Sequence, residues 1–313
     1  MNFGRVGVLL GGRSSEREIS LMSGRAVLQA LRSRGVDAIA FDPGLQTVSE
    51  LEQARFDRVF IALHGRFGED GTIQGVLETL RIPYTGSGVQ ASSIALDKLV
   101  TKRLWVWAGI PTPQWRELEA DSDFDAIARD LGGPVVVKPR TEGSTIGITK
   151  VTSSQHGELA RAFTEARRYD TRVFAEELIA GRELTCAILG AGAGAEALPL
   201  VEVRAPAGNY DYQNKYFKHD TQYLCPAPID GALAQRIQRV CLQAYTVVGA
   251  RGWGRVDVML KPHPDGDQPM LLELNTSPGM TGHSLVPIAA RARGMDFADL
   301  VVRIVSEATL EVK

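Results

Sequence analysis

The chain has 313 residues, of which 44% are hydrophobic and 23% are charged, and its formal net charge is −2 at pH 7. This length allows two or three compact units with buried cores, and the composition excludes a largely disordered protein. A net charge so near zero gives no electrostatic reason to expect nucleic acid or an anionic membrane as the main partner. The composition therefore favours chemistry on small molecules.

Cysteine usage and the N-terminus indicate the compartment. Cys186, Cys225 and Cys241 show no CxxC spacing, which indicates neither a disulfide framework nor a zinc site. The apolar run at 5–10 is too short for a signal peptide or a membrane-spanning helix. We therefore expect a protein of the reducing cytoplasm without a membrane partner.

Strand-like and helix-like patterns alternate at the start of the chain. Apolar β-rich runs occur at 5–10, 36–41 and 57–63, and helical spacing occurs at 19–34 and 72–80. Such alternation predicts a parallel, Rossmann-like α/β sheet. We assign it to an N-terminal domain of residues 1–96.

Two further domains are predicted, at 97–185 and 186–313. One helical stretch over 92–109 marks the first junction, because it ends in the breaker IPTP. The later strand-like runs lie at 134–139, 171–179, 182–190, 197–204, 253–260 and 270–275, and helical patterns lie near 156–168, near 231–248 and from about 296. The middle unit reads as a small α+β domain.

The runs at 253–260 and 270–275 surround an Asp-Gly turn signal and read as an antiparallel hairpin. Strand alternation places Arg255 and Asp257 on one face of the first strand. In the second strand it places Glu273 and Asn275 on one face, opposite the leucines at 272 and 274. The polar side chains of the hairpin are thus separated from its apolar ones.

A symmetric register would place Asp257 opposite Glu273 and Arg255 opposite Asn275. Two carboxylates facing each other destabilise a hairpin unless a cation joins them. Oxygen ligands of this kind suit magnesium bound together with nucleotide phosphates. The alternative is a solvated outer face of the hairpin, and the strand pattern alone does not separate the two.

The segment at 275–284, NTSPGMTGHS, favours the site. Its small and turn-forming residues leave backbone N–H groups that could receive an anion or a developing oxyanion. The alternative is a plain surface loop. Binding residues concentrate on loops held by rigid elements, so a loop beside a metal hairpin is more plausibly a site.

Four other residues are candidates from their positions alone. The loop before Glu16 has neither GxGxxG nor GxxxxGK[ST], so Glu16 is read as an acceptor for a substrate ammonium or as an acid near a helix start. His64 lies in a glycine-rich turn after a strand; a hydrogen-bonded turn or core residue fits a lone histidine better than proton transfer, and we keep it as a substrate-binding candidate. Lys138, in an apolar run, needs an anionic partner or an exit to water. Lys98 carries less information, because most helical lysines are solvated.

Eight segments in order resemble the D-alanine-D-alanine ligases of bacterial cell-wall synthesis, which belong to the ATP-grasp superfamily. They are LLGGRSSEREIS, ALHGRFGEDGTIQG, PYTGSG, LDKLVTK, VVKPRTEGSTIG, DYQNKY, GWGRVDVML and LELNTSPGMTGHSLVP. Together they span nearly the whole chain. The resemblance implies an ATP-grasp fold that clamps ATP between the central and C-terminal units, and a homodimer.

The resemblance also implies roles for individual residues. Asp257, Glu273 and Asn275 would hold two Mg²⁺ ions, for which Mn²⁺ could substitute. The nucleotide would contact Lys98 and Lys138 through its phosphates, Glu176 and the backbone near Ile179 through adenine, and Glu183 through ribose. Glu16 would take the ammonium of the first substrate, and the second substrate would contact Lys215, Ser284 and Leu285.

The implied reaction joins two D-alanines through an acyl phosphate. Arg255 and the backbone N–H of Gly279 would stabilise the developing oxyanions. A trio of Glu16, Ser144 and Tyr216 would tie the N-terminal loop to two closing segments, RTEGSTIG and DYQNKYFKHD. The phenol of Tyr216 favours a dipeptide product over D-alanine-D-lactate.

Two departures from the family pattern concern nucleotide affinity and loop closure. Leu178 stands where many relatives have a tryptophan, and Thr141 stands where an arginine often precedes EGS. The alternatives to a D-alanine-D-alanine ligase are another ATP-grasp carboxylate-amine ligase, a D-alanine-D-lactate ligase, and a nucleotide-binding protein without activity.

Overall fold

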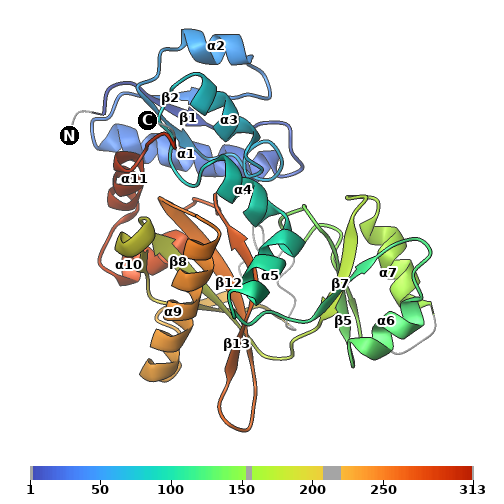
Figure 1. Cartoon of the computed structure of the whole chain (residues 1–313). Coiled ribbons are helices and arrows are strands. Elements are labelled where there is room, and N and C mark those ends of the chain that lie inside the picture. The colour runs from blue at the N-terminus through green and yellow to red at the C-terminus, as the bar shows by residue number, and fades with distance from the viewer. Residues whose placement is uncertain (1–2, 153–156, 207–219, 312–313) are drawn as a thin grey trace.

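The computed structural model describes residues 3–152, 157–206 and 220–311. Within them the strands form three sheets, each covered by its own helices (Figure 1). None of the described helices is both long and apolar enough to cross a membrane. All three cysteines are free thiols.

The N-terminal sheet is parallel, as predicted, with the order β2-β1-β3. Its strands are β1 (Val6–Leu9), β2 (Ala38–Phe41) and β3 (Arg58–Ile61), and its helices are α1 (Arg17–Ser33), α2 (Val48–Gln53) and α3 (Thr72–Thr79). All four residues of β1 are buried, because helices cover both faces of a parallel sheet.

The central sheet is antiparallel, with the order β4-β7-β5-β6. Its elements are β4 (Trp115–Leu118), α6 (Phe124–Asp130), β5 (Val135–Pro139), β6 (Thr149–Val151), α7 (Glu158–Ala166) and β7 (Val173–Glu177). Helix α7 buries Leu159, Ala162, Phe163 and Ala166, the spacing of one helical face. The sequence patterns missed β4, α6 and β6.

The C-terminal sheet has the order β11-β10-β8-β12-β13, and β9 pairs with β8. Its strands are β8 (Arg182–Leu189), β9 (Glu196–Ala197), β10 (Val201–Arg204), β11 (Gln222–Leu224), β12 (Trp253–Lys261) and β13 (Gln268–Asn275). The helices that follow β8 are α9 (Gly231–Val247), α10 (Leu285–Ala292) and α11 (Phe297–Ser306). β12 lies between β8 and β13 and is the most enclosed strand of the hairpin.

Two features join the units. The predicted domain boundary at 185/186 falls inside β8, whose partners β10 and β12 both belong to the C-terminal sheet. The pairing of β8 therefore favours a boundary before Arg182, and the division into three domains stays a prediction. Helix α11 lies against α1 of the N-terminal unit (Figure 1). The Phe60 and Trp253 rings also meet across these units, with centroids 5.9 Å apart.

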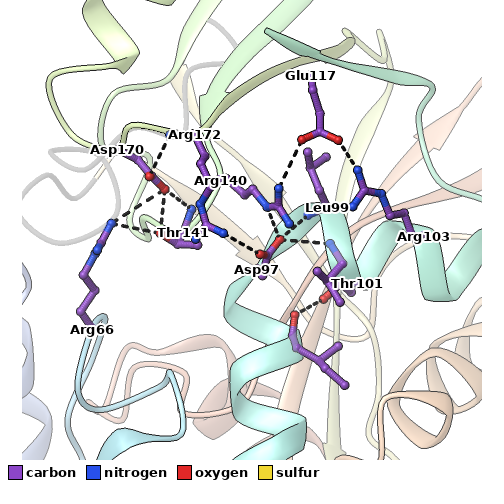
Figure 2. Close-up of polar contacts among 12 residues, drawn as sticks. Arg66, Asp97, Leu99, Thr101, Arg103, Glu117, Arg140, Thr141, Asp170 and Arg172 are labelled. Atoms are coloured by element: carbon purple, nitrogen blue, oxygen red, sulfur yellow. Dashed lines mark hydrogen bonds and ion pairs between the residues drawn. The ribbon is translucent and has the colours of Figure 1, made fainter. Parts of the chain in front are cut away.

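The single helix expected over 92–109 was wrong. The chain forms α4 (Val89–Leu96) and then α5 (Lys98–Trp107), and the break is at Asp97. The Asp97 carboxylate accepts hydrogen bonds from the backbone N–H groups of Leu99 and Val100, at 3.2 and 3.1 Å. A side-chain oxygen that satisfies the first turn starts a new helix there. Arg140 Nε also donates to this carboxylate at 2.6 Å (Figure 2).

We expect Asp97→Ala to lower the free energy of unfolding by about 2 to 4 kcal/mol, measured by urea denaturation. The loss combines a helix cap with the Arg140 Nε hydrogen bond, which leaves that mostly buried guanidinium its longer contact with Glu117 at 3.3 Å. The matched control is Asp123→Ala, which removes the cap of α6, where Asp123 accepts only from Ala126 N–H among the bonds described. That variant should cost about 1 kcal/mol. Equal losses in the two variants would contradict the role of Arg140.

Candidate functional site

Two cavities adjoin beside the β12–β13 hairpin. The first cavity, of about 180 Å³, lies between the N-terminal unit and the hairpin and is lined by Glu16, His64 and Arg255 among others. The second cavity, of about 360 Å³, lies between the central sheet and the hairpin. Gly143, Ser144 and Glu273 line both. A molecule in one cavity can therefore meet a molecule in the other at these residues.

The hairpin has the predicted register where it carries the acidic pair. Asp257 lies opposite Glu273, and Arg255 lies opposite Asn275. A bulge between Asp257 and Val258 then shifts the pairing and leaves Leu272 as an extra residue on β13. The predicted face of Leu272 was therefore wrong, because Leu272 lines the second cavity together with Glu273.

Nearby cations balance both carboxylates of the hairpin. Arg255 donates to the two Asp257 oxygens from Nε and Nη2, at 2.6 and 2.7 Å, and Asn275 Nδ2 adds a third bond at 3.1 Å. Lys98 Nζ lies 3.4 Å from Glu273 Oε2. Across the described ranges, no group of three or more His, Cys, Asp and Glu side chains could hold a metal ion. Within the described residues the hairpin thus offers two carboxylates, with the amide of Asn275 beside them.

Glu176 lines the second cavity, and its predicted contact with adenine stays a prediction. Its buried carboxylate forms an ion pair with Lys138 and lies 2.9 Å from Lys102 Nζ. Although burial opposes ionisation, these two lysines lower the pKa of Glu176. Burial likewise opposes the charge on Lys138, but Glu176 raises the pKa of that lysine. Lys138 is thus a held cation at the wall of the second cavity, as its apolar setting required.

The other nucleotide candidates line the second cavity. Lys98 lies there, and its Nζ donates to the backbone oxygen of Glu142 at 2.6 Å. Ile179, Glu183 and Leu178 lie on the same wall. The residues predicted to bind the nucleotide thus lie in one cavity. Their contacts with a bound nucleotide stay predictions.

Residues 141–147 form a loop that separates the two cavities. Ser144 and Thr145 have left-handed backbones, with φ of 51° and 65°. The Ser144 hydroxyl donates to the carboxylate of Glu16, which makes no capping hydrogen bond at the start of α1. Two members of the predicted trio therefore meet. Tyr216 and Lys215 lie outside the described residues.

His64 is hydrogen-bonded at both ring nitrogens. Burial lowers the pKa of His64 to about 4, so the ring is neutral at pH 7. Nδ1 donates to Ser277 O at 2.9 Å, which leaves Nε2 to accept from the Ser23 hydroxyl at 3.0 Å. Ser23 Oγ in turn accepts from Met280 N–H at 3.1 Å. His64 and Ser23 thus hold both ends of the Ser277–Met280 turn. This is the hydrogen-bonded role for His64 that the sequence favoured over proton transfer.

The turn held in this way leads to the remaining substrate candidates. Gly279, Ser284 and Leu285 all line the first cavity. A Cβ on Gly279 would lie 3.2 Å from Ser284 Oγ, so a side chain there would crowd the wall. Ser284 precedes α10, and its Oγ accepts from Thr281 N–H at 2.9 Å. The predicted anion loop is therefore a rigid part of the cavity.

Glu69 is a cavity residue that sequence reasoning missed. It lines the first cavity and accepts from Gly65 N–H at 2.8 Å. Burial, together with the neighbouring Glu16 carboxylate, raises the pKa of Glu69 to about 8. The only sequence signal was its place in the glycine-rich turn after His64, and an acid in a turn is usually solvated.

The raised pKa of Glu69 predicts a pH dependence of stability. Because the folded state binds this proton more tightly than the unfolded chain does, the stabilisation is complete below the ordinary carboxyl pKa of 4.5 and is lost as pH rises through about 8. Glu69→Gln cannot ionise. We expect the variant to gain a few kcal/mol over the parent at about pH 9 and almost nothing at about pH 4, in urea unfolding with a chelator present. Parallel pH curves for the two proteins would exclude a buried neutral Glu69.

Comparison with known proteins shows the family to which the chain belongs. The model described as the D-ala D-ala ligase C-terminus matches residues 104–306, and the one described as the D-ala D-ala ligase N-terminus matches residues 42–87. The chain belongs to the D-alanine-D-alanine ligase family. The D-alanine-D-alanine ligase of Cupriavidus necator is 60% identical over 99% of this chain and 94% of its own length. The ligase of Bordetella avium is 55% identical over 99% and 96%.

Solved structures of the ligase family share the fold. The D-alanine-D-alanine ligase of Bacillus anthracis superposes with a TM-score of 0.83 at 34% identity, covering 96% of each chain. A structure of that ligase complexed with ATP gives a TM-score of 0.82 at 34% identity, again over 96% of each chain. These matches confirm the predicted ATP-grasp fold.

Proposed function

We propose that this protein uses ATP to join two D-alanines into D-alanyl-D-alanine for peptidoglycan precursors. A carboxylate oxygen of the first D-alanine attacks the γ-phosphorus of ATP, and ADP leaves. The amine of the second D-alanine, having lost a proton, then attacks the acyl carbon, and phosphate leaves. The observation that carries the proposal is the meeting of a small and a larger cavity at Gly143, Ser144 and Glu273.

The charges along the cavities fit this arrangement of substrates. Glu16 in the first cavity can receive an ammonium group, which directs the carboxylate of the first D-alanine toward Glu273 and the second cavity. Lys98 and Lys138 offer cations to phosphates in the second cavity. Glu176 and the backbone near Ile179 line the same cavity and would contact adenine there.

The residues of the hairpin also fit magnesium. Asp257 and Glu273 offer two carboxylates, and Asn275 would offer its amide oxygen after a turn of the carboxamide, whose NH₂ now faces Asp257. Mg²⁺ takes few protein oxygens and keeps water or phosphate at its other positions. When bound, one or two Mg²⁺ ions, or Mn²⁺, would neutralise charge on the phosphates.

Arg255 and Gly279 would serve the second step. The Arg255 guanidinium lines the first cavity and is held by Asp257. The turn that contains Gly279 is fixed by His64 and Ser23. Held donors stabilise a developing oxyanion without reorganising during the reaction. The exclusion of water also matters, because water hydrolyses an acyl phosphate.

A coupled assay of phosphate release tests the function against its alternatives. We expect ADP and phosphate to form with D-alanine, no comparable rate with L-alanine, and neither a faster rate nor a depsipeptide product when D-lactate is added to D-alanine at neutral pH. A depsipeptide ligase would respond to D-lactate, and an inactive nucleotide-binding protein would respond to nothing. Absence of D-alanine-dependent ADP formation would sink the proposal.

Removal of one hairpin carboxylate tests the metal site. We expect Glu273→Gln to reduce Mg²⁺-dependent turnover by about a hundredfold or more, with a melting temperature within about 2 °C of the parent. Stability should change little, because Glu273 is 28% exposed and its ion pair with Lys98 spans 3.4 Å. The control is Glu196→Gln, a 36% exposed carboxylate paired with Arg293 and Arg303 away from both cavities. Equal turnover of Glu273→Gln and the parent would contradict the assignment.

The biological setting follows from the same proposal. A ligase that uses ATP and D-alanine would act in the cytoplasm, and the free thiols agree with that compartment. A homodimer is proposed from the family resemblance. Sedimentation or light scattering of the full chain measures it directly.

A further inference from the structure

The 141–147 loop is bound to the N-terminal unit by Arg66. The Arg66 Nε donates to Glu142 Oε1 at 3.0 Å. Its Nη2 donates to Thr141 Oγ1 at 3.1 Å (Figure 2). The same nitrogen lies 3.8 Å from Asp170 Oδ2. One guanidinium from the turn after β3 thus contacts three residues of the central unit.

The loop needs such contacts to keep its shape. Two consecutive residues without a glycine's freedom, Ser144 and Thr145, are held in left-handed conformations. Such conformations carry a local energy cost and persist only where surrounding contacts fix them. Glu142 supplies two of these contacts, its carboxylate to Arg66 and its backbone oxygen to Lys98. The Ser144 hydroxyl supplies another, to Glu16.

The base from which Arg66 extends is itself rigid. Gly65 N–H donates to Glu69, and Phe67 N–H donates to Asp70 at 2.8 Å. The Ser14 hydroxyl donates to His64 O at 2.7 Å. A fixed base lets the guanidinium constrain the loop rather than follow it.

Thr141 explains why an arginine at 66 can act here. Its backbone N–H and hydroxyl both donate to Asp170 Oδ2, at 2.9 and 2.7 Å, while its Oγ1 accepts from Arg66. The guanidinium of Arg66 thus reaches the place beside Asp170 that a long side chain at 141 could occupy. Where many relatives have an arginine at position 141, the cation beside Asp170 is here Arg66 of the N-terminal unit.

We infer that Arg66 is a positioning residue that latches the 141–147 loop over both cavities by tying it to the N-terminal unit. The inference rests on the proposed ligase function, since closure protects the acyl phosphate. With 54% of its side chain exposed, Arg66 makes contacts that water can replace at little cost. Such contacts suit a loop that opens for substrates and closes for chemistry in each cycle.

The loss of the latch should uncouple the reaction. We expect Arg66→Met to lower kcat for dipeptide by about threefold to tenfold, the range for a half-exposed guanidinium with two polar partners. Water entering the open loop would hydrolyse acyl phosphate to D-alanine and phosphate. The ratio of phosphate to dipeptide should therefore rise from about one to about two. A purely structural role would lower both products together.

A double-mutant cycle assigns the effect to the pair. Glu142→Gln should reproduce part of the loss, and Arg66→Met with Glu142→Gln should lose little more than Arg66→Met alone. The matched control is Arg34→Met, because Arg34 also joins two units, pairing with Asp296 at 2.8 Å and Asp299 at 2.7 Å. It should leave the product ratio unchanged. Additive losses, or the same ratio in both arginine variants, would overturn the inference.

Hydrogen exchange of the loop amides provides a test that does not depend on turnover. Exchange at residues 142–147 should be faster in Arg66→Met than in the parent and in Arg34→Met, with equal melting temperatures. Thr141→Arg added to Arg66→Met should restore both slow exchange and the product ratio. Unchanged loop exchange in Arg66→Met would overturn the latch. A parent without D-alanine-dependent ADP formation but with faster loop exchange in Arg66→Met would overturn the ligase proposal alone.

Discussion

The opposition of Asp257 and Glu273 across β12 and β13 is the constraint on which the site depends. Two carboxylates directly opposite each other on neighbouring strands repel, so nearby cations are needed to balance them. Arg255 comes from the same strand, and Lys98 comes from the first position of α5. Lys98 reaches Glu273 because Asp97 starts a new helix just before it. The break between α4 and α5 is therefore part of the site.

The site takes its shape from contacts between units rather than within one. His64, Ser23 and Ser277 link the N-terminal unit to the turn after β13, and α11 packs against α1 behind it. On the other side, Ser144 reaches Glu16 across the boundary between the cavities. Each cavity wall is thus shared by two units, and a small movement between them changes both cavities at once.

Buried ionisable side chains beside the cavities are either paired with the opposite charge or protonated. Lys102, Glu176 and Lys138 form a largely buried row beside the second cavity, and the removal of Glu176 would take away the counter-charge that the two lysines share. Glu69 shows the other solution, because burial and then the neighbouring Glu16 carboxylate raise its pKa to about 8 and favour the protonated acid. The structure thus combines paired ions with a protonated acid around one reaction space.

The sequence by itself determined the parallel N-terminal sheet, the hairpin register at Asp257 and Glu273, and the family, because each depends on local periodicity or on ordered motifs. Only the tertiary structure decided the rest. The bulge that turns Leu272 toward the cavity has no pattern of its own, and the short elements β4, α6 and β6 are too brief for periodicity. The enclosure of Glu176 and the contacts of Arg66 join residues far apart in the chain, and spacing carries no information about such pairs.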